Sequence, residues 1–322
     1  MAARPGGGLS ARPQQLRQTP TPNPSPQVGG ALPLLMGIVN VTPDSFSDGG
    51  QFLDPQAALA HAHRLIAEGA DVLDIGGEST RPGAAPVDEA EEIARVIPVI
   101  EAVRRESDIP ISIDTMKAAV ARAAVMAGAT MWNDVTALSL APDSVATAAE
   151  LGCEVVLMHM QGEPRTMQAA PRYDDVVAEV SDFLAARADA AIAAGVRREN
   201  IWLDPGIGFG KTADHSLALL RHLDQIIALG FPVLVGVSRK SSIARIAGDK
   251  SREDQRLGGS LAAALAAAKA GAAMLRVHDV ADTRQALAVA AAISTPVGGG
   301  GPRSGGGGTR PSTASEDKGE VA

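Results

Sequence analysis

Residues 66–83 read IAEGADVLDIGGESTRPG, and this stretch holds a unit that recurs along the chain. An Ala-rich amphipathic segment ends at Gly69 in the manner of a helix C-cap, and a short apolar run over Asp71–Ile75 follows it. The run then ends in a turn of glycines, hydroxyl side chains and an arginine. A helix that leads back into a buried strand is the repeating unit of parallel α/β folds.

The chain holds eight such apolar runs, with Ala-rich helix-like segments between them. Nearly continuous hydrophobic strands that alternate with helices predict a parallel sheet covered on both faces. Eight repeats favour a closed (β/α)8 TIM barrel over an open doubly wound sheet. The runs are Leu34–Val39, Asp71–Ile75, Pro110–Ile113, Thr130–Trp132, Glu154–Met158, Ile201–Leu203, Pro232–Val237 and Ala273–Val277. The helix-like segments include Asp54–Glu68, Asp88–Glu106, Tyr173–Ala194, Ser216–Leu229 and Gln255–Ala270, and six of the connections begin at Gly69, Gly128, Gly152, Gly195, Gly230 and Gly271.

The two ends of the 322-residue chain differ from its middle. Residues 1–33 are rich in Gly, Pro, Gln and Ser, and residues 295–322 are Gly-rich and then polar. Neither stretch can bury enough apolar surface to offset the entropy of ordering it, so we predict two disordered tails. We favour a flexible extension, or a start codon assigned too early, over a transit peptide for the first. Residues 34–294 are then a single barrel domain.

The composition excludes several classes of protein. The net charge of −8 argues against a nucleic-acid partner, because phosphate binding needs a basic face. No apolar run reaches the ~18 residues of a membrane span. A single cysteine excludes an internal disulfide and predicts a reducing, cytoplasmic location. Aromatic residues make up only 2% of the chain, and it holds six lysines, so a Lys or Phe within a glycine-rich turn indicates a function.

Every predicted strand ends in polar residues. In a barrel these positions converge on the C-terminal mouth, where such enzymes place their chemistry. Polar strand ends are weak evidence alone, since any strand that leaves a core meets water. The amides, short acids and cations found here are better evidence for a ligand site. In order they are Asn40, residues 76–81, Asp114, Asn133-Asp134, His159, Asp204, Ser238-Arg239-Lys240 and residues 276–279.

Two of these strand ends continue into unusual loops. The segment Gly37–Gly50 leads from the first strand into a loop of ~15 residues, which is long for a βα turn and typical of a lid or a binding loop. Residues 76–83 offer backbone amides and Arg81, which suit an anionic ligand, whereas the alternative is a capped turn with a solvated arginine.

A third loop, DPGIGFGK at residues 204–211, resembles two phosphate-binding motifs without matching either. Pro205 stands where a P-loop needs glycine, and Lys211 stands where a dinucleotide-binding fingerprint needs glycine. What remains is an acid at a strand end, followed by a loop that carries Phe209 and Lys211.

The histidines do not have the spacing of a metal site. His159 and His278 lie at strand ends and are candidates for a ligand site, although a buried structural histidine is the alternative for His159. Of the other four, the first two are two residues apart on a helix and point to different faces, and the last two are seven residues apart, about 10 Å along a helix axis. We predict that all four are solvated. These four are His61, His63, His215 and His222.

Taken together, the clusters resemble the dihydropteroate synthase family. Seven motifs occur in that family's order between Leu35 and Ile293, which spans the whole predicted core. They are GIVNVTPDSFSDGG, GGESTRPG, SIDT, MHMQG, DPGIGFGK, GVSRKS and RVHDV.

The resemblance implies a set of site residues. It implies a pterin pocket of Asp114, Asn133, Asp204, Lys240 and Arg276. The implied diphosphate ligands are Asn40, Thr80, Arg276 and His278, with Mg2+ held by Asn40 and Asp48. The implied p-aminobenzoate pocket is Phe46, Thr80, Arg81, Pro82, Phe209, Lys240 and Ser241. Lys240, Arg276, His278 and Asp48 would carry the catalytic roles.

The implied activity is a transferase reaction of folate biosynthesis. It joins p-aminobenzoate to 6-hydroxymethyl-7,8-dihydropterin diphosphate by a Mg2+-assisted dissociative displacement, and releases pyrophosphate. The resemblance also implies a homodimer and a target of sulfonamides. Two alternatives remain: a non-catalytic paralogue that only binds pterin, and a barrel enzyme that acts on another phosphorylated metabolite.

Overall fold

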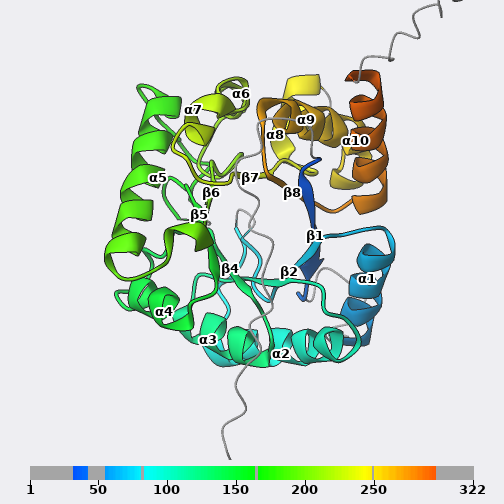
Figure 1. Cartoon of the computed structure of the whole chain (residues 1–322). Helices are drawn as coiled ribbons and strands as arrows, with labels where there is room; N and C mark the ends of the chain where they lie inside the picture. Colours follow the sequence, from blue (N-terminus) through cyan, green and yellow to red (C-terminus); the bar gives the residue numbers. More distant parts are fainter. Residues whose placement is uncertain (1–31, 43–54, 81–82, 164–165, 249, 295–322) are drawn as a thin grey trace, which may run out of the picture.

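The computed structural model describes residues 32–42, 55–80, 83–163, 166–248 and 250–294. Within them, eight parallel strands pair in the order β6-β5-β4-β3-β2-β1-β8-β7. A bridge between Leu203 and Val233 joins the two ends of this order and closes the sheet. The predicted TIM barrel is confirmed, with the helices arranged around the strands (Figure 1). The strands are β1 (Leu34–Asn40), β2 (Val72–Gly76), β3 (Ile111–Asp114), β4 (Met131–Asp134), β5 (Glu154–Met158), β6 (Ile201–Asp204), β7 (Leu234–Gly236) and β8 (Met274–Val277).

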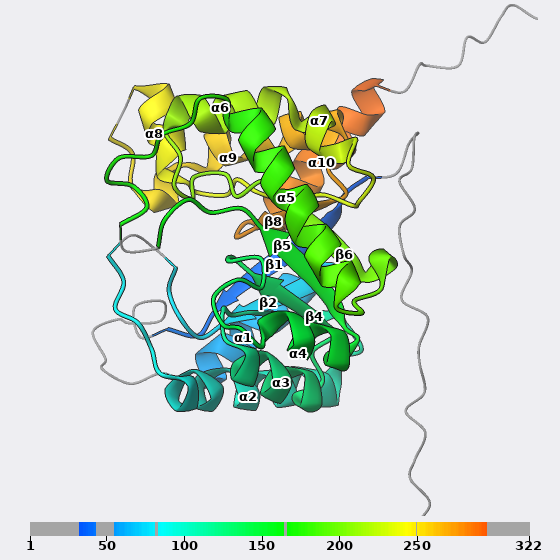
Figure 2. The ribbon, with the colours of Figure 1, turned by 90° about the vertical axis from the view of Figure 1, so that its left-hand side faces the viewer.

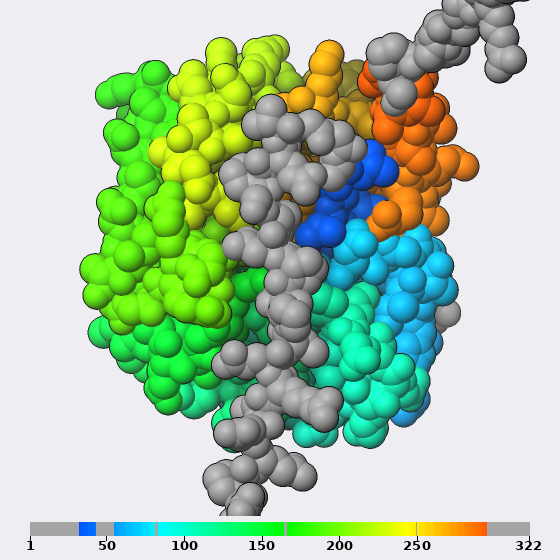
Figure 3. All heavy atoms as spheres, in the orientation of Figure 1, coloured from blue at the N-terminus to red at the C-terminus, as the bar shows by residue number. Residues whose placement is uncertain are grey.

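The helices follow one another around the barrel in sequence order. In the space-filling view the colours accordingly run around the molecule in sequence order, from blue and cyan through green and yellow to orange (Figure 3). The apolar faces of the helices and the outward strand residues form the larger hydrophobic core. The helices are α1 (Pro55–Ala67), α2 (Glu89–Glu106), α3 (Ala118–Ala127), α4 (Ser144–Leu151), α5 (Val176–Ala193), α6 (Ala213–Arg221), α7 (Leu223–Ile227), α8 (Ser241–Ala247), α9 (Leu257–Ala270) and α10 (Val280–Ser294).

Capping residues explain where two of the predicted helices begin. The Asp88 side chain accepts a hydrogen bond from the amide of Glu91 at 2.7 Å, which starts α2 at Glu89. Asp175 accepts from the amides of Val177 and Ala178, so α5 begins at Val176 and not at Tyr173. The capping acid satisfies amides that have no partner within the helix.

One predicted helix is two helices in the structure. The segment Ser216–Leu229 was expected to be continuous, but the backbone leaves the helical region at His222, with φ −115° and ψ 30°. The helical hydrogen-bond ladder therefore stops at the end of α6 and restarts in α7.

The prediction that four helix histidines are solvated is wrong for two of them. His61 is half-buried, and its Nε2 lies 3.1 Å from the carbonyl oxygen of Ile38. Burial, and then the charge of Arg64, lowers the pKa of His61. His215 accepts at Nδ1 from the amide of Thr212 and completes a capping box at the start of α6.

The barrel interior has an apolar floor and a polar layer above it. Alternate residues of a strand point to the same side, so the residue two positions after a floor residue also faces inward. Met274 of the floor is followed in this way by Arg276, and Met131 by Asn133. The change from apolar to polar therefore occurs inside the barrel, toward the C-terminal strand ends. The floor is Met36, Val72, Met131, Val156, Trp202, Leu234 and Met274.

The loops at the C-terminal strand ends form the mouth of the barrel. Figure 2 shows the loops that follow β2 and β5, and helix α8, at the same side of the molecule. Within the described residues, every helix is too short or too polar to span a lipid bilayer. The predicted tails lie outside the described residues, apart from residues 32–33, and the division of the chain into tails and barrel stays a prediction.

Gly206, at the mouth, is expected to tolerate no side chain. Its φ is +65°, and a Cβ there would lie 1.9 Å from the carbonyl oxygen of His159. Gly152 has nearly the same φ, +64°, but nothing lies within 4 Å of a Cβ there. Gly152→Ala should thus cost about 1 kcal/mol of left-handed backbone strain, and Gly206→Ala about 3 kcal/mol because a clash is added. Urea unfolding of both variants gives the difference, and equal losses would contradict the predicted clash.

Candidate active site

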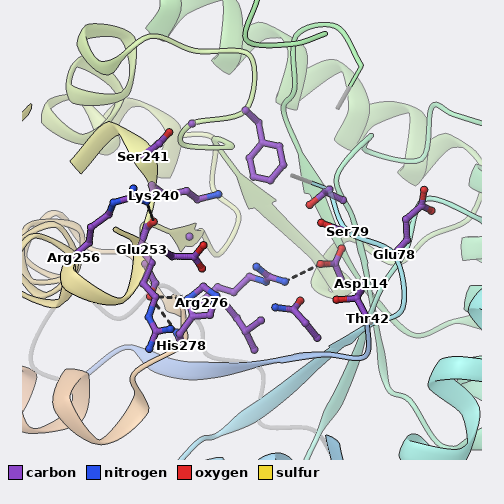
Figure 4. A pocket seen from close by; sticks show the side chains of 18 of the residues that line it. Thr42, Glu78, Ser79, Asp114, Lys240, Ser241, Glu253, Arg256, Arg276 and His278 are labelled. Atoms are coloured by element: carbon purple, nitrogen blue, oxygen red, sulfur yellow. Dashed lines mark hydrogen bonds and ion pairs between the residues drawn. The ribbon is translucent and has the colours of Figure 1, made fainter. Parts of the chain in front are cut away.

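A pocket of about 420 Å3 opens at the C-terminal end of the barrel (Figure 4). It is lined by residues from the ends of β1, β2, β3, β7 and β8, and from the loops after β5 and β6. The structure therefore brings together side chains that are far apart in the sequence, such as Asn40 and His278, which are 238 positions apart. Of the residues predicted from the sequence, those that line the pocket are Asn40, Thr80, Asp114, Phe209, Lys240, Ser241, Arg276 and His278.

Two predicted residues are buried below the pocket lining. Asn133 is 4% exposed, and its Nδ2 donates to Asp74 Oδ2 at 3.1 Å. Asp204 is 5% exposed and accepts from the amide of Gly206 at 2.7 Å. Burial raises the pKa of Asp204 to about 6, against the hydrogen bond from Gly206 and the charge of Lys240, which lower it. Four other predicted residues lie outside the described part of the chain: Phe46, Asp48, Arg81 and Pro82.

Arg276 lies across the pocket and pairs with two acids. Its Nε donates to Asp74 Oδ2 at 2.6 Å. Its Nη2 donates to Asp114 Oδ2 at 2.8 Å, a contact drawn as a dashed line in Figure 4. Burial alone would lower the pKa of Arg276, but the charges of Asp74 and Asp114 outweigh it and raise that pKa. The guanidinium is therefore a fixed positive charge with a set orientation.

Asp74 was missed in the sequence analysis. It is completely buried in β2, and its Oδ2 accepts from both Arg276 and Asn133. The sequence did contain a sign of it, since Asp74 is an acid within an otherwise apolar strand. It was missed because only the residues at the strand ends were considered as candidates. Asp74 links two of the predicted site residues and is part of the site's support.

Asp114, the second acid that pairs with Arg276, faces the pocket. It is 8% exposed and lines the pocket, whereas Asp74 does not. Burial raises the pKa of Asp114 to about 7; Arg276 acts in the opposite direction and Asp74 adds to the increase. The carboxyl group can thus change its protonation state near neutral pH, as many ligand-binding acids do.

Lys240 lies over an aromatic ring at the other side of the pocket. Its Nζ is 4.1 Å from the centroid of the Phe209 ring, a cation–π distance. Burial lowers the pKa of Lys240 to about 8, and the charge of Arg276 lowers it further against the pull of Asp204. Lys240 precedes α8, so β7 and the start of that helix fix its backbone.

His278 lies beside the end of β7. Its Nδ1 is 3.0 Å from Ser238 Oγ, and its amide donates to the same oxygen at 3.2 Å. The neighbouring Arg239 has a left-handed φ of 57° and pairs with Asp279 through its Nε at 3.0 Å. These contacts hold the β7 and β8 ends together, and Arg239 lines the pocket as well.

Two charged pocket residues, Glu253 and Arg256, come from a segment that the sequence analysis left without a function. Arg256 Nη1 donates to the carbonyl oxygen of Arg239 at 2.9 Å, which ties this segment to the β7 end. In the sequence this segment is a run of charged residues, a pattern that is equally typical of a solvated surface.

The metal-binding prediction rests on oxygen donors. Within the described residues, no group of three or more His, Cys, Asp or Glu residues could hold a metal ion. Asn40, which lines the pocket, is an oxygen donor of the kind that Mg2+ takes while keeping most of its waters. Asn40 is thus the one predicted metal ligand within the described residues, since Asp48 lies outside them, and the Mg2+ site stays a prediction.

Comparison with known proteins identifies the family. The family model of pterin binding enzymes matches residues 36–278. Dihydropteroate synthase of Haemophilus influenzae is 49% identical over 259 residues, which cover 80% of this chain and 93% of that protein. The chain belongs to the dihydropteroate synthase family. The matched residues include every pocket residue described above from Asn40 to His278.

Two solved structures of the family come from Xanthomonas albilineans. Dihydropteroate synthase with 4-aminobenzoic acid has a TM-score of 0.77 and 53% identity, and the match covers 82% of this chain and 94% of that one. The same enzyme in complex with 7,8-dihydropteroate has a TM-score of 0.75 and 50% identity, with coverage of 82% and 95%. The predicted family membership and barrel fold are thus confirmed.

Proposed function

We propose that this protein is a dihydropteroate synthase, a transferase that condenses p-aminobenzoate with 6-hydroxymethyl-7,8-dihydropterin diphosphate and releases pyrophosphate. The observation that carries this proposal is the pocket itself, where Asp114, Arg276, Lys240 and His278 meet in a chain of this family. The related enzyme from Xanthomonas albilineans has been solved with 4-aminobenzoic acid and, in a second structure, with 7,8-dihydropteroate, which supports the same substrate and product for this chain.

The acids and the amide at the base of the pocket suit a pterin. The edge of a pterin ring presents N–H donors and acceptors, which Asp114, Asn133 and Asp204 can pair. An analogue without these groups would leave buried polar atoms unpaired, at about 1–3 kcal/mol for each. Arg276 is held by Asp74 and Asp114, so its planar guanidinium can lie against the ring in a fixed orientation.

The leaving diphosphate is assigned to the β1, β2 and β8 ends. Asn40, Thr80 and His278 line that part of the pocket with Arg276. Negative charge gathers on the diphosphate as the C–O bond breaks, and preorganised positive groups stabilise it. Mg2+, when bound with Asn40 and Asp48, would supply Lewis-acid stabilisation of the same charge.

The reaction needs no strong protein nucleophile. The C–O bond to the diphosphate breaks with its electron pair on oxygen, the arylamine nitrogen forms the new C–N bond, and its proton is lost to solvent. We propose that bond breaking leads, because the pterin ring can stabilise a cationic methylene carbon. Phe209, Lys240, Ser241 and Thr80 line the side of the pocket that we assign to p-aminobenzoate. The family resemblance adds Phe46, Arg81 and Pro82 to this assignment, and these three lie outside the described residues.

Pyrophosphate release with both substrates present tests this function. A dihydropteroate synthase should release pyrophosphate in step with dihydropteroate, and none when p-aminobenzoate is omitted. A pterin-binding paralogue would show a thermal shift with the pterin diphosphate but no release. A barrel enzyme with another substrate would show neither. Each of the last two results would refute the proposal.

Pterin affinity is expected to depend on pH through Asp114. The pKa of about 7 in the folded protein exceeds the ordinary 3.8, so the native protein binds a proton that the unfolded chain releases. Stability of the free protein therefore falls as the pH rises from about 4 to 7. Pterin N–H donors need the ionised carboxylate, so pterin affinity should rise over the same window and fall by up to about tenfold per unit below pH 7. Calorimetry at several pH values checks this, and a flat profile would contradict it.

Three further features are proposed from the sequence and from the exposed surface. We propose a homodimer, to which the exposed Val289 and Ile293 of α10 could contribute apolar surface. Light scattering of the purified protein would show its mass in solution. We also propose a cytoplasmic location, from the single cysteine, and disordered tails over residues 1–33 and 295–322, from their composition.

A further inference from the structure

We propose that Lys211 is a positioning residue, which fixes the loop of residues 206–211 so that Phe209 supports Lys240 in the p-aminobenzoate part of the pocket. The inference rests on the proposed function, and it assigns a task to a buried lysine that the reaction described above does not use.

Lys211 is an unusual residue to bury. It is only 2% exposed, and Nζ makes three contacts: 2.8 Å to His159 Nδ1, 3.2 Å to the carbonyl oxygen of His159 and 3.0 Å to that of Phe209. Placing an ammonium group in a protein interior is costly unless its donors are paired. The three contacts pair all three donors of the ammonium.

His159 is built to accept this contact. Burial lowers the pKa of Lys211 to about 7. In its charged form Lys211 has only donors, so Nδ1 of a neutral His159 ring then accepts from it. Burial, and then the charge of Lys211, lowers the pKa of His159 to about 3. The ring packs edge-on against Phe183 at 4.8 Å between centroids, which fixes its orientation. His159 follows β5, so Lys211 ties the loop after β6 to the rigid end of the neighbouring strand.

The hydrogen bond from Lys211 to the carbonyl oxygen of Phe209 is one of three that side chains donate to consecutive carbonyl groups of the loop. Gln168 donates to the carbonyl oxygen of Gly208, Lys211 to that of Phe209, and the Tyr173 hydroxyl to that of Gly210 at 2.9 Å. We call this set of three hydrogen bonds the carbonyl clamp. Each of the three donors is a side-chain group, so a single substitution can remove one hydrogen bond of the clamp and leave the other two.

The clamp acts on the residue that contacts Lys240. The Phe209 ring lies 4.1 Å below Lys240 Nζ. The Gly208 backbone also passes near this side chain, since a Cβ added at Gly208 would lie 3.5 Å from Lys240 Cδ. A shift of this loop therefore changes the packing around Lys240.

Of the residues assigned to the pterin, Asp114 and Asn133 lie on β3 and β4, away from the loop. Asp204 and Lys240 do contact the loop, through the Gly206 amide and the Phe209 ring. The pterin therefore keeps two of its contacts when the loop shifts, whereas the p-aminobenzoate side has both Phe209 and Lys240 displaced. Loss of the clamp should thus affect p-aminobenzoate more than the pterin.

Lys211→Met keeps the length and the apolar stem of the side chain and removes the ammonium. We expect the KM for p-aminobenzoate to rise by about tenfold, while the Kd for the pterin changes by less than about threefold, because a small displacement of a positioning group weakens the substrate that it contacts. Lys269→Met, on an exposed face of α9, makes the same change of charge and should leave both constants unchanged. Tyr173→Phe removes only the donor to Gly210 and should raise the same KM by about threefold.

Steady-state kinetics and calorimetry on the full chain decide whether Lys211 positions the p-aminobenzoate part of the pocket or only stabilises the fold. A lower Tm with unchanged KM would show that Lys211 is structural only and would overturn the proposal, as would equal losses for both substrates. If Lys211→Met fails to fold, Tyr173→Phe decides, and an unchanged KM overturns the proposal. Pyrophosphate release by the wild-type protein is measured first, so failure of the proposed function appears there and not in the variants.

Discussion

Asp114→Asn is expected to lower pterin affinity by at least about thirtyfold while leaving the barrel folded. The carboxylate ends β3, lines the pocket and is 8% exposed. Asparagine has one acceptor oxygen where the carboxylate has two, and its amide group would face the N–H donors of the pterin. The change also removes one of the two acids that hold Arg276 and leaves that guanidinium with Asp74. Both effects weaken the pterin site.

Titration calorimetry with the pterin measures this loss. Asp224→Asn is a matched control, because it removes the same charge from an exposed position in α7. The control should bind the pterin like the wild type, and both variants should unfold within a few degrees of it. Near wild-type affinity of Asp114→Asn would refute the assignment of Asp114 to the pterin site.

The barrel was predictable because its units are local. Each strand is a short apolar run, and the glycines at positions 69, 128, 152, 195, 230 and 271 all adopt the positive φ expected of helix C-caps. All eight predicted strands occur in the structure, with ends that differ by a few residues. The break at His222 could not be predicted, because the Ser216–Leu229 segment has no glycine or proline that would end a helix before Gly230.

The site was predictable where its residues end strands, and less so elsewhere. Arg276 and Asn133 lie two positions after floor residues, and Asp74 lies two positions after Val72 in the same way. Strand alternation therefore placed Asp74 inside the barrel, and it could have been found. The contact between Lys211 and His159 joins positions 52 apart, and the residue types alone do not indicate it. The place of Glu253 and Arg256 in the pocket likewise depends on the path of the chain after α8, which the sequence does not predict.

Lys240→Ala is expected to lower kcat/KM by at least about 100-fold, which corresponds to ~2.7 kcal/mol of transition-state stabilisation. Lys240 is the residue that the two halves of the pocket share. Its Nζ lies over Phe209 on the p-aminobenzoate side, while the charges of Asp204 and Asp114 act on the same ammonium from the pterin side. Its long stem can pack against the arylamine while the ammonium reaches an acceptor of the pterin. Its removal should therefore reduce turnover more than either binding step alone.

The alternative for Lys240 is a solvated lysine at a turn, and removal of such a residue costs less than about 0.5 kcal/mol. Lys269→Ala provides that case in the same chain, since Lys269 is exposed on α9. Steady-state kinetics with each substrate varied in turn, on folded variants, separates the two. If Lys240→Ala stays within about threefold of the wild type, as Lys269→Ala should, then Lys240 does not contact the substrates, and the pocket assigned at the end of β7 is misplaced. A loss confined to kcat, with both substrates still bound, would instead place the ammonium beside the reacting atoms, because only an interaction stronger in the transition state than in the ground state has that effect.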